Sequence, residues 1–422
     1  MKVYKFGGAS VRSAEGVRNI VRIVSAVSGD LFIVVSAMGK TTNALETVLE
    51  NFMKADREAA LEKLSEIEGY HRDVISELFT DPGQGYKAVK PLFDEIRTLI
   101  NNGVGDEYDR WYDRLVSCGE IISTRIVSAF FTESGMDNVW LDMRKLLVTD
   151  SNFREANVRM EESEKRISEA VDFSKSRIYI GQGFIGANTK GDPTTLGREG
   201  SDYSAAIAGN LLNAESVTIW KDVPGILNAD PRIFPNTALI PELTYHDAVE
   251  LAYSGAQIIH PKTIKPLQNK LIPLYVRPFG TPDEAGSIIN ETAPPIAVPV
   301  LILRKNQVLV TMRPRDFSFV LEESLTKIFA IMNKRRLKVS LIQSSAVSIS
   351  VCVDNTRYLL DALDEMGNDF KVSYNDKLEL LTIRGRNDEV IRQTTSGRDI
   401  LLSQKTRRIA RFLMREEGVY SL

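Results

Sequence analysis

Short runs of β-branched and aromatic residues alternate with longer amphipathic stretches through the first 220 residues. This alternation is typical of strands joined by helices, and it predicts an α/β fold with a mainly parallel sheet sandwiched by helices. The strands are predicted at 2–6, 31–36, 138–141, 177–181 and 216–220.

A long helical region lies between the second and third predicted strands. It runs from Thr42 to about Phe131 and is broken by Asp81-Pro82-Gly83-Gln84-Gly85. Such a segment is longer than a simple crossover, so we expect a helical layer beside or over the edge of the sheet. One apolar stripe at helical spacing should face the core; it consists of Trp111, Leu115, Cys118 and Ile122.

Residues 293–299 contain three prolines, a composition that suits a linker. After it the predicted order is strand 307–312, helix 322–335, strands 337–342 and 347–353, helix 357–366 and strand 370–374, which is a ferredoxin-like βαββαβ module. Strand 378–383 and helix 406–415 would form an incomplete or interleaved second copy. The expected division is therefore 1–292, linker 293–299 and 300–422.

Composition narrows the class of protein. The formal charge of −3 and the scattered basic residues argue against a nucleic-acid partner. No apolar run reaches the roughly 20 residues of a membrane helix, and the N-terminus lacks the pattern of a signal peptide. Only Cys118 and Cys352 are present, without metal-type spacing, which fits a reduced cytoplasmic compartment.

Three glycine-rich segments compete as a phosphate site. Residues 181–186 match G-x-G-x-x-G, but the loop predicted at 187–193 stands where a dinucleotide site needs a helix. Gly39-Lys40-Thr41 ends like a P-loop, but Val34 occupies the position of its first glycine. Neither segment is a convincing phosphate loop.

The third segment is Lys5-Phe6-Gly7-Gly8-Ala9-Ser10, where a strand carries a lysine to its end. The two glycines allow backbone N–H groups to approach an anion, and a helix predicted near Ser13 adds a positive dipole end. By itself such a segment is more often an ordinary tight turn than a phosphate site.

Residues 194–206 combine a flexible loop with the start of a small-residue helix. Arg198 could clamp a substrate carboxylate, while Asp202 could orient the lysine or a magnesium-bound phosphate. The alternative is ordinary capping by Ser201 or Asp202 with Arg198 on the surface.

Together with these segments, Ser117-Cys118-Gly119-Glu120 and 220–225 resemble motifs of the aspartokinases, in the amino-acid kinase superfamily, and 300–422 is similar to ACT domains. The resemblance implies the amino-acid kinase fold and phosphorylation of the β-carboxylate of L-aspartate by ATP. The product would be 4-phospho-L-aspartate, in the first step of the lysine, threonine and methionine branch. It also implies a homodimer or higher homo-oligomer formed through the ACT-like region.

The resemblance assigns roles to individual residues. Catalysis would rest on Lys5 and Asp202, with the ATP phosphates on Lys5, Gly7, Gly8 and Ser10. Aspartate would contact Ser36, Thr42, Glu120, Arg198 and Ser201, with Glu120 on the α-ammonium and Arg198 on a carboxylate. The nucleotide would be lined by Lys221, Asp222, Asp230 and Arg232. No protein metal ligand is expected, since Mg²⁺ would be held mainly through the phosphates.

Several positions depart from the family pattern. Around the nucleotide these are Ala9, Glu199, Leu227 and Gln257. In the ACT-like region, Ser340 and Ala346 replace the carboxylates that lysine-inhibited relatives use, and Glu323 replaces a glycine. An acidic side chain at a helix start would repel the carboxylate of a bound amino acid. We therefore expect weak or absent inhibition by lysine.

Two other functions stay open. One is another carboxylate kinase of the same superfamily, and the other is an amino-acid sensor built on an inactive kinase. The Glu120 motif and the ACT-like region argue against the first, and the intact Lys5, Arg198 and Asp202 argue against the second. The length leaves no room for a fused homoserine dehydrogenase.

Overall fold

The computed structural model describes residues 1–422 except 104–106, 257–258, 316–318, 320–321, 386 and 417–422. Its contacts form two compact units. The first consists of Met1–Ile226, Pro241–Val249 and Ile258–Pro294. The second consists of Leu227–Ile240, Glu250–Gln257 and Pro295–Leu422. Two short segments before the proline-rich stretch thus belong to the second unit, while the domain limits at 292 and 300 remain predictions.

The first unit is built around an eight-stranded sheet with the order β11-β13-β12-β8-β1-β2-β5-β3. Its strands are β1 (Lys2–Phe6), β2 (Leu31–Val35), β3 (Val139–Trp140), β5 (Ile178–Gln182), β8 (Ser216–Lys221), β11 (Glu242–Thr244), β12 (Leu274–Pro278) and β13 (Ser287–Asn290). Adjacent pairs are parallel except β12 with β13. All five predicted strands are present, and the prediction of an α/β fold with a mainly parallel sheet is confirmed.

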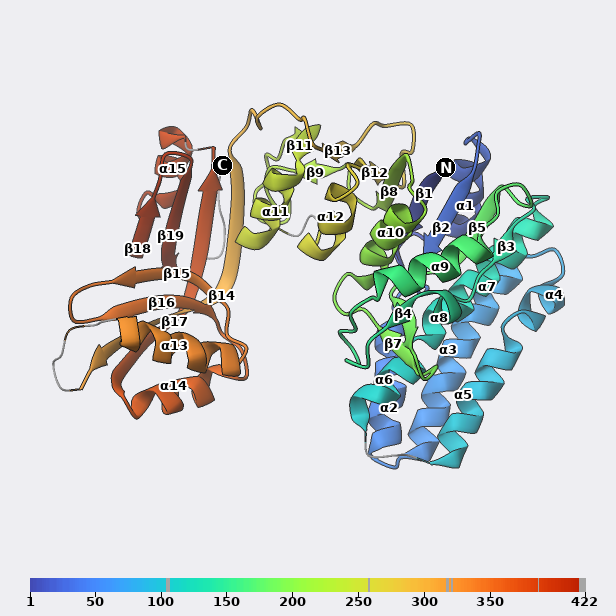
Figure 1. The fold of residues 1–422 in the computed structure, drawn as a ribbon, viewed down its shortest axis with the longest axis horizontal. Coiled ribbons are helices and arrows are strands. Elements are labelled where there is room, and N and C mark those ends of the chain that lie inside the picture. The colour runs from blue at the N-terminus through green and yellow to red at the C-terminus, as the bar shows by residue number, and fades with distance from the viewer. Residues whose placement is uncertain (104–106, 257–258, 316–318, 320–321, 386, 417–422) are drawn as a thin grey trace. The chain divides into compact units, whose positions relative to one another are not determined.

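Helices occupy the region between β2 and β3. They are α2 (Thr41–Met53), α3 (Arg57–Leu78), α4 (Pro82–Lys87), α5 (Lys90–Asn102), α6 (Tyr108–Val116) and α7 (Cys118–Glu133). Figure 1 shows α2, α3 and α5 side by side, and α2 and α5 each contact α3. The break predicted at residues 81–85 is partly wrong, because the helices are interrupted between Leu78 and Pro82 but residues 82–85 belong to α4, which Asp81 caps.

The predicted apolar stripe lies in the core. Leu115, Cys118 and Ile122 are buried, and Trp111 is partly buried against them. The stretch Tyr108–Glu133 is long and apolar enough to cross a membrane, but 72% of its apolar window is buried within the protein. Its apolarity therefore serves the packing of the helical layer and the sheet.

The alternation of side chains along the strands separates two faces of the sheet. Tyr4 and Phe6 of β1 belong to the core that includes α1 (Ala14–Ser25) and the helical layer. Lys5 lies between them in sequence and therefore points to the other face, where α10 (Gly200–Leu211) packs on β1, β2 and β8.

The remaining elements of this part of the chain are short. They are α8 (Met143–Leu146), β4 (Val148–Thr149), α9 (Met160–Ala170), β6 (Ile185–Asn188), β7 (Pro193–Thr195), β9 (Ile226–Leu227), β10 (Leu239–Ile240), α11 (Tyr245–Ser254) and α12 (Pro261–Gln268). Strand β5 leads into β6 rather than into a helix, which excludes a dinucleotide site at 181–186. The loop predicted at 187–193 is partly wrong, because β6 extends to Asn188 and β7 begins at Pro193.

The second unit holds a six-stranded sheet with the order β15-β16-β14-β17-β19-β18. Its elements are β14 (Val300–Pro314), α13 (Glu322–Lys334), β15 (Val339–Ser344), β16 (Ile349–Asp354), α14 (Leu359–Gly367), β17 (Phe370–Arg384), α15 (Asp388–Thr395), β18 (Ile400–Lys405) and β19 (Ile409–Arg415). The elements from β14 to β17 follow the predicted ferredoxin-like order. The strands predicted at 370–374 and 378–383 are one strand, β17.

The helix predicted at 406–415 is wrong, because Ile409–Arg415 is the strand β19. Apolar residues fall on both faces of β19, so periodicity alone did not separate helix from strand. Pairing decides the outcome: β19 lies between β17 and β18, and Ala410, Phe412 and Met414 are buried on one face.

Long strands link two modules in this sheet. The first half of β14 pairs with the second half of β17, from Val300 opposite Arg384 to Arg304 opposite Leu380. The second half of β17, α15, β18 and β19 form most of a second ferredoxin-like module. The beginning of β14 completes it as its fourth strand, beside β17.

Candidate active site at the carboxyl edge of the parallel sheet

Four neighbouring parallel strands end at one edge of the first unit. In spatial order they are β8, β1, β2 and β5, and their ends carry Lys221, Lys5, Ser36 and Gly183. In the register, Lys5 lies opposite both Ile219 and Val34. Ligands of open α/β sheets bind outside the carboxyl ends of the strands, so this edge is the first place to look for a site.

Two lysines and one aspartate form a cluster there, in which Lys5 and Asp202 are buried and Lys221 is partly exposed. Asp202 lies in the first turn of α10, with Oδ1 2.6 Å from Lys5 Nζ and Oδ2 3.5 Å from Lys221 Nζ. Burial of Asp202 favours its neutral form, but the positive charges of Lys5 and Lys221 outweigh this and lower its pKa. A carboxylate buried between two lysines is costly for stability, and such clusters are enriched at functional sites.

The glycine turn after β1 packs tightly against the loop after β2. A Cβ on Gly8 would lie 2.8 Å from the carbonyl oxygen of Ala37, and Gly39 N donates to Gly8 O at 3.0 Å. A Cβ on Gly7 would lie 3.3 Å from Lys5 Nζ. Gly7 therefore keeps a side chain away from the lysine, and Gly8 allows the close approach of the two loops. Helix α1 follows and begins near Ser13, as predicted, with Ser13 as its N-cap.

Glu120 is buried beside this loop, with 3% of its surface exposed. Ala37 N donates to its Oε1 at 3.4 Å, while Oε2 has no hydrogen-bond partner among the described residues. Burial raises the pKa of Glu120 to about 8, although the bond from Ala37 and the charge of Lys5 oppose the shift. A buried carboxyl with an open acceptor is suited to receive a cationic group.

The motif 195–202 connects β7 to α10 through a strained loop. Gly197 and Glu199 have φ of 76° and 54°, and the non-glycine Glu199 is held by a bond from His260 N to its Oε2 at 2.9 Å. The N-cap of α10 is Glu199, so the capping alternative for Ser201 and Asp202 is wrong. Arg198 is exposed and has no ion pair within the described part of the chain.

The G-x-G-x-x-G segment at 181–186 has a packing role at this edge. A Cβ on Gly183 would lie 2.5 Å from Ser201 Cβ, so Gly183 lets the start of α10 approach the end of β5. This contact brings Ser201, and next to it Asp202, to the carboxyl edge.

Asp113, on α6, helps to position the site, and the sequence alone did not predict it. It is fully buried, and its carboxylate accepts bonds from Thr195 N at 2.9 Å, Thr195 Oγ1 at 2.6 Å and Arg154 N at 2.9 Å. Burial raises its pKa to about 6, against the effect of these donors. Asp113 therefore anchors the beginning of the loop that carries Arg198. Its helical spacing to buried Val116 was the one available signal.

The other predicted residues are distributed around this edge. Ser36 and Thr42 are partly buried after β2 and in the first turn of α2. Ser10 is buried, and with exposed Asp222 it lines an open cavity of about 870 Å³ that Ala9, Arg12 and Phe279 also line. A cavity of this size is in the range of ligand sites.

Two predicted nucleotide contacts belong to the second unit. Arg232 Nη2 lies 2.7 Å from Asp230 Oδ2, so these side chains pair with each other. Among the departures from the family pattern, Leu227 ends β9, whereas Gln257 lies outside the described residues.

Comparison with known proteins identifies the family of this chain. Residues 1–278 match the model of the amino acid kinase family. The lysine-sensitive aspartokinase 3 of Escherichia coli is 32% identical over 356 residues, covering 84% of this chain and 78% of the relative. The chloroplastic aspartokinase 1 of Arabidopsis thaliana is 31% identical over 400 residues, covering 91% and 69%.

A solved structure agrees over nearly the whole chain. The crystal structure of E. coli aspartokinase III in complex with aspartate and ADP has a TM-score of 0.84 and 27% identity, covering 98% of this chain and 96% of that one. This chain belongs to the aspartokinases, within the amino acid kinase family.

Proposed function

We propose that this chain transfers the γ-phosphoryl group of ATP to the β-carboxylate of L-aspartate, giving 4-phospho-L-aspartate and ADP. The observation that carries the proposal is the cluster in which Asp202 holds Lys5 and Lys221 at the carboxyl edge of the sheet. Two fixed cations beside a glycine turn suit a transferring phosphoryl group.

The reaction needs little proton chemistry. The β-carboxylate of free aspartate has a pKa of about 3.9, so the attacking oxygen is already ionised at neutral pH. The remaining task is to bring two anions together and to neutralise the charge that spreads over the phosphoryl oxygens. Lys5, Lys221 and the N–H groups of Gly7 and Gly8 would supply this neutralisation.

The two substrates would bind on different groups. Glu120 would accept the α-ammonium of aspartate, Arg198 would bind its α-carboxylate, and Ser36, Thr42 and Ser201 would complete the aspartate site. Ser10 and Asp222 would contact the nucleotide from the cavity of about 870 Å³. Asp230 and Arg232, which pair with each other in the second unit, stay predicted nucleotide contacts.

The metal would enter with the nucleotide. No group of three or more His, Cys, Asp or Glu side chains is placed to hold a metal ion in the described ranges, and Asp202 is engaged by two lysines. The predicted substrate is MgATP, in which the phosphate oxygens mainly hold Mg²⁺.

The same proposal covers the metabolic pathway of the product and the association of copies of the chain. The product would enter the lysine, threonine and methionine branch in the cytoplasm. The second unit would join copies of the chain through the open edge of β15, where Ile342 of the strand and Val347 just beyond it expose apolar side chains.

A hydroxylamine trap tests the reaction. The full chain is incubated with MgATP, hydroxylamine and one amino acid, and the hydroxamate of the acyl phosphate is measured. We expect product with L-aspartate and at most a trace with L-glutamate or N-acetyl-L-glutamate. Preference for either glutamate substrate would favour another kinase of the superfamily. Absence of product with all three would favour an inactive sensor.

A further inference from the structure

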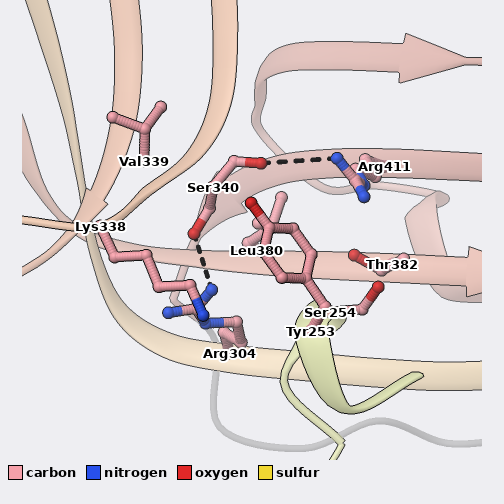
Figure 2. Close-up of a pocket in the computed structure, with 9 residues that line it drawn as sticks. All are labelled: Tyr253, Ser254, Arg304, Lys338, Val339, Ser340, Leu380, Thr382 and Arg411. Carbon is pink, nitrogen blue, oxygen red and sulfur yellow. Dashed lines mark hydrogen bonds between the residues drawn. The ribbon is translucent and has the colours of Figure 1, made fainter. Parts of the chain in front are cut away.

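The second unit contains a small basic pocket that the proposed reaction does not use. Figure 2 shows its lining, which comes from the end of α11 and from β14, β15, β17 and β19: Tyr253, Ser254, Arg304, Lys338, Val339, Ser340, Leu380, Thr382 and Arg411. Three of these side chains are cationic, four carry hydroxyl groups, and none is acidic. Its free volume of about 10 Å³ accommodates one group the size of a water molecule.

The cations differ in how far they are neutralised. Arg304 Nη2 contacts both oxygens of Asp354, at 2.6 and 2.5 Å, and Nη1 donates to Ser340 Oγ at 2.7 Å. Arg411 Nη1 donates only to Ser340 O, at 3.4 Å, and Lys338 Nζ lies 4.7 Å from the centre of the Tyr253 ring. Neither Lys338 nor Arg411 has an acidic partner within the described residues. Two positive charges therefore remain uncompensated.

A buried threonine lines the same space. Thr382 is 2% exposed as a residue, but its hydroxyl oxygen is not a buried unpaired atom and so opens onto the pocket. Thr382 and Arg411 are opposite each other on β17 and β19, so their side chains share one face of the sheet. The other face carries Leu381 and Phe412, which pack in a separate core with residues of α15. A hydroxyl that opens onto the pocket beside an arginine can donate to an acceptor bound there.

We infer that this pocket binds one oxyanion group, a carboxylate or phosphate, of a small metabolite. Arg411 offers a planar guanidinium to two oxygens, Lys338 adds a point charge, and Thr382 donates its hydroxyl. Because the free volume has room for one water-sized group, one oxygen of the carboxylate or phosphate would enter the pocket, and the rest of the ligand would lie at its mouth. The site lies wholly within the second unit, so it does not depend on the phosphoryl transfer proposed for the first.

Calorimetric titration of the full chain tests the inference, with inorganic phosphate and acetate as probes. A Lys5→Ala background weakens phosphate binding at the carboxyl edge of the first unit and leaves the pocket intact. We expect millimolar or tighter binding of at least one probe, weakened about tenfold or more by Arg411→Gln. Arg415→Gln, on the same strand but outside the pocket, should change the affinity less than about twofold.

Two further variants keep the result interpretable if Arg411→Gln unfolds. Lys338→Gln removes an exposed charge, and Thr382→Val keeps the shape of the side chain while removing the hydroxyl. Each should weaken binding several-fold at unchanged thermal stability. Binding of phosphate alone, acetate alone or both identifies the class of oxyanion. No binding of either probe below about 50 mM, or affinities unchanged in all three variants, would overturn the inference.

Discussion

At the scale of single residues, the site depends on which charges are fixed before any substrate arrives. Asp202 holds Lys5 and Lys221 at the carboxyl edge of the sheet, while burial raises the pKa of nearby Glu120 to about 8. A lysine pair held in this way would not need to reorganise when a phosphoryl group arrives, which is the main electrostatic advantage of such sites.

Lys5→Ala should nearly abolish turnover. Removing Lys5 takes away a cation from the transferring group and leaves Asp202 with one partner, so kcat should fall by about 10²-fold or more. The measurement is steady-state kinetics of ADP release. Lys2→Ala, at the other end of β1, is the matched control and should retain near-normal kcat. Equal rates for Lys5→Ala and the control would remove Lys5 from the mechanism.

The raised pKa of Glu120 predicts a pH dependence. Aspartate carries an α-ammonium group that binds the ionised carboxylate, so kcat/KM for aspartate should rise with pH toward a plateau above about 8. In Glu120→Gln this rise should disappear and KM for aspartate should increase about tenfold or more. A wild-type profile that is flat between pH 6.5 and about 9 would contradict the assignment.

The same pKa has a consequence for stability, with a definite sign. The folded pKa of about 8 exceeds the ordinary value of 4.5, so the folded protein without substrate retains a proton that the unfolded chain loses. Stability should therefore decrease as the pH rises between these values. Chemical denaturation of Glu120→Gln should show a smaller decrease over the same range than the unchanged protein.

At the scale of elements, the loop that carries Arg198 is anchored by a residue of another helix. Asp113 on α6 fixes Thr195 at the end of β7, and the loop then continues through Arg198 to α10. Asp113→Asn keeps the shape of the side chain but replaces one acceptor oxygen by a donor. We expect KM for aspartate to rise about tenfold and KM for ATP to change much less.

Asp109→Asn is the control for this effect, because Asp109 is an exposed residue of the same helix that pairs with Arg154 at 3.3 Å. It should leave both KM values within about twofold. A parallel loss of aspartate and ATP affinity in Asp113→Asn, with a lower thermal midpoint, would show that Asp113 acts only on stability.

What the sequence predicted at this scale depends on how local the signal is. The runs at 2–6 and 216–220 are short, apolar and bounded by turn residues, so β1 and β8 were predictable. Residues 406–415 carry apolar side chains on both faces, which hid β19. The role of Asp113 was not visible because Thr195 is 82 residues away. The pairing of Lys5 with Asp202 was suggested by the motif at 194–206 as one of two alternatives, and the family resemblance favoured it.

At the scale of the whole molecule, a kinase unit is joined to a sheet of interleaved ferredoxin-like modules. By the family resemblance, Ser340 and Ala346 stand where lysine-inhibited relatives carry carboxylates, and Ser340 accepts a bond from Arg304. Neither residue carries a negative charge that would attract the amino groups of lysine.

Millimolar lysine should accordingly leave the rate nearly unchanged, with less than about twofold inhibition. The measurement is the initial rate of ADP release at aspartate concentrations near KM, with threonine tested in parallel. Restoring a carboxylate with Ser340→Asp is a direct control and should increase the response to lysine. Strong inhibition of the unchanged chain by lysine would refute this expectation.

The central claim is that a new bond forms between phosphorus and an oxygen of the β-carboxylate. ³¹P NMR with L-aspartate labelled with ¹⁸O in that carboxylate observes the bond directly. We expect an acyl phosphate resonance that appears with MgATP and shifts when the label is present. ADP formation without a shifted acyl phosphate resonance, or a shift only when the α-carboxylate carries the label, would contradict it.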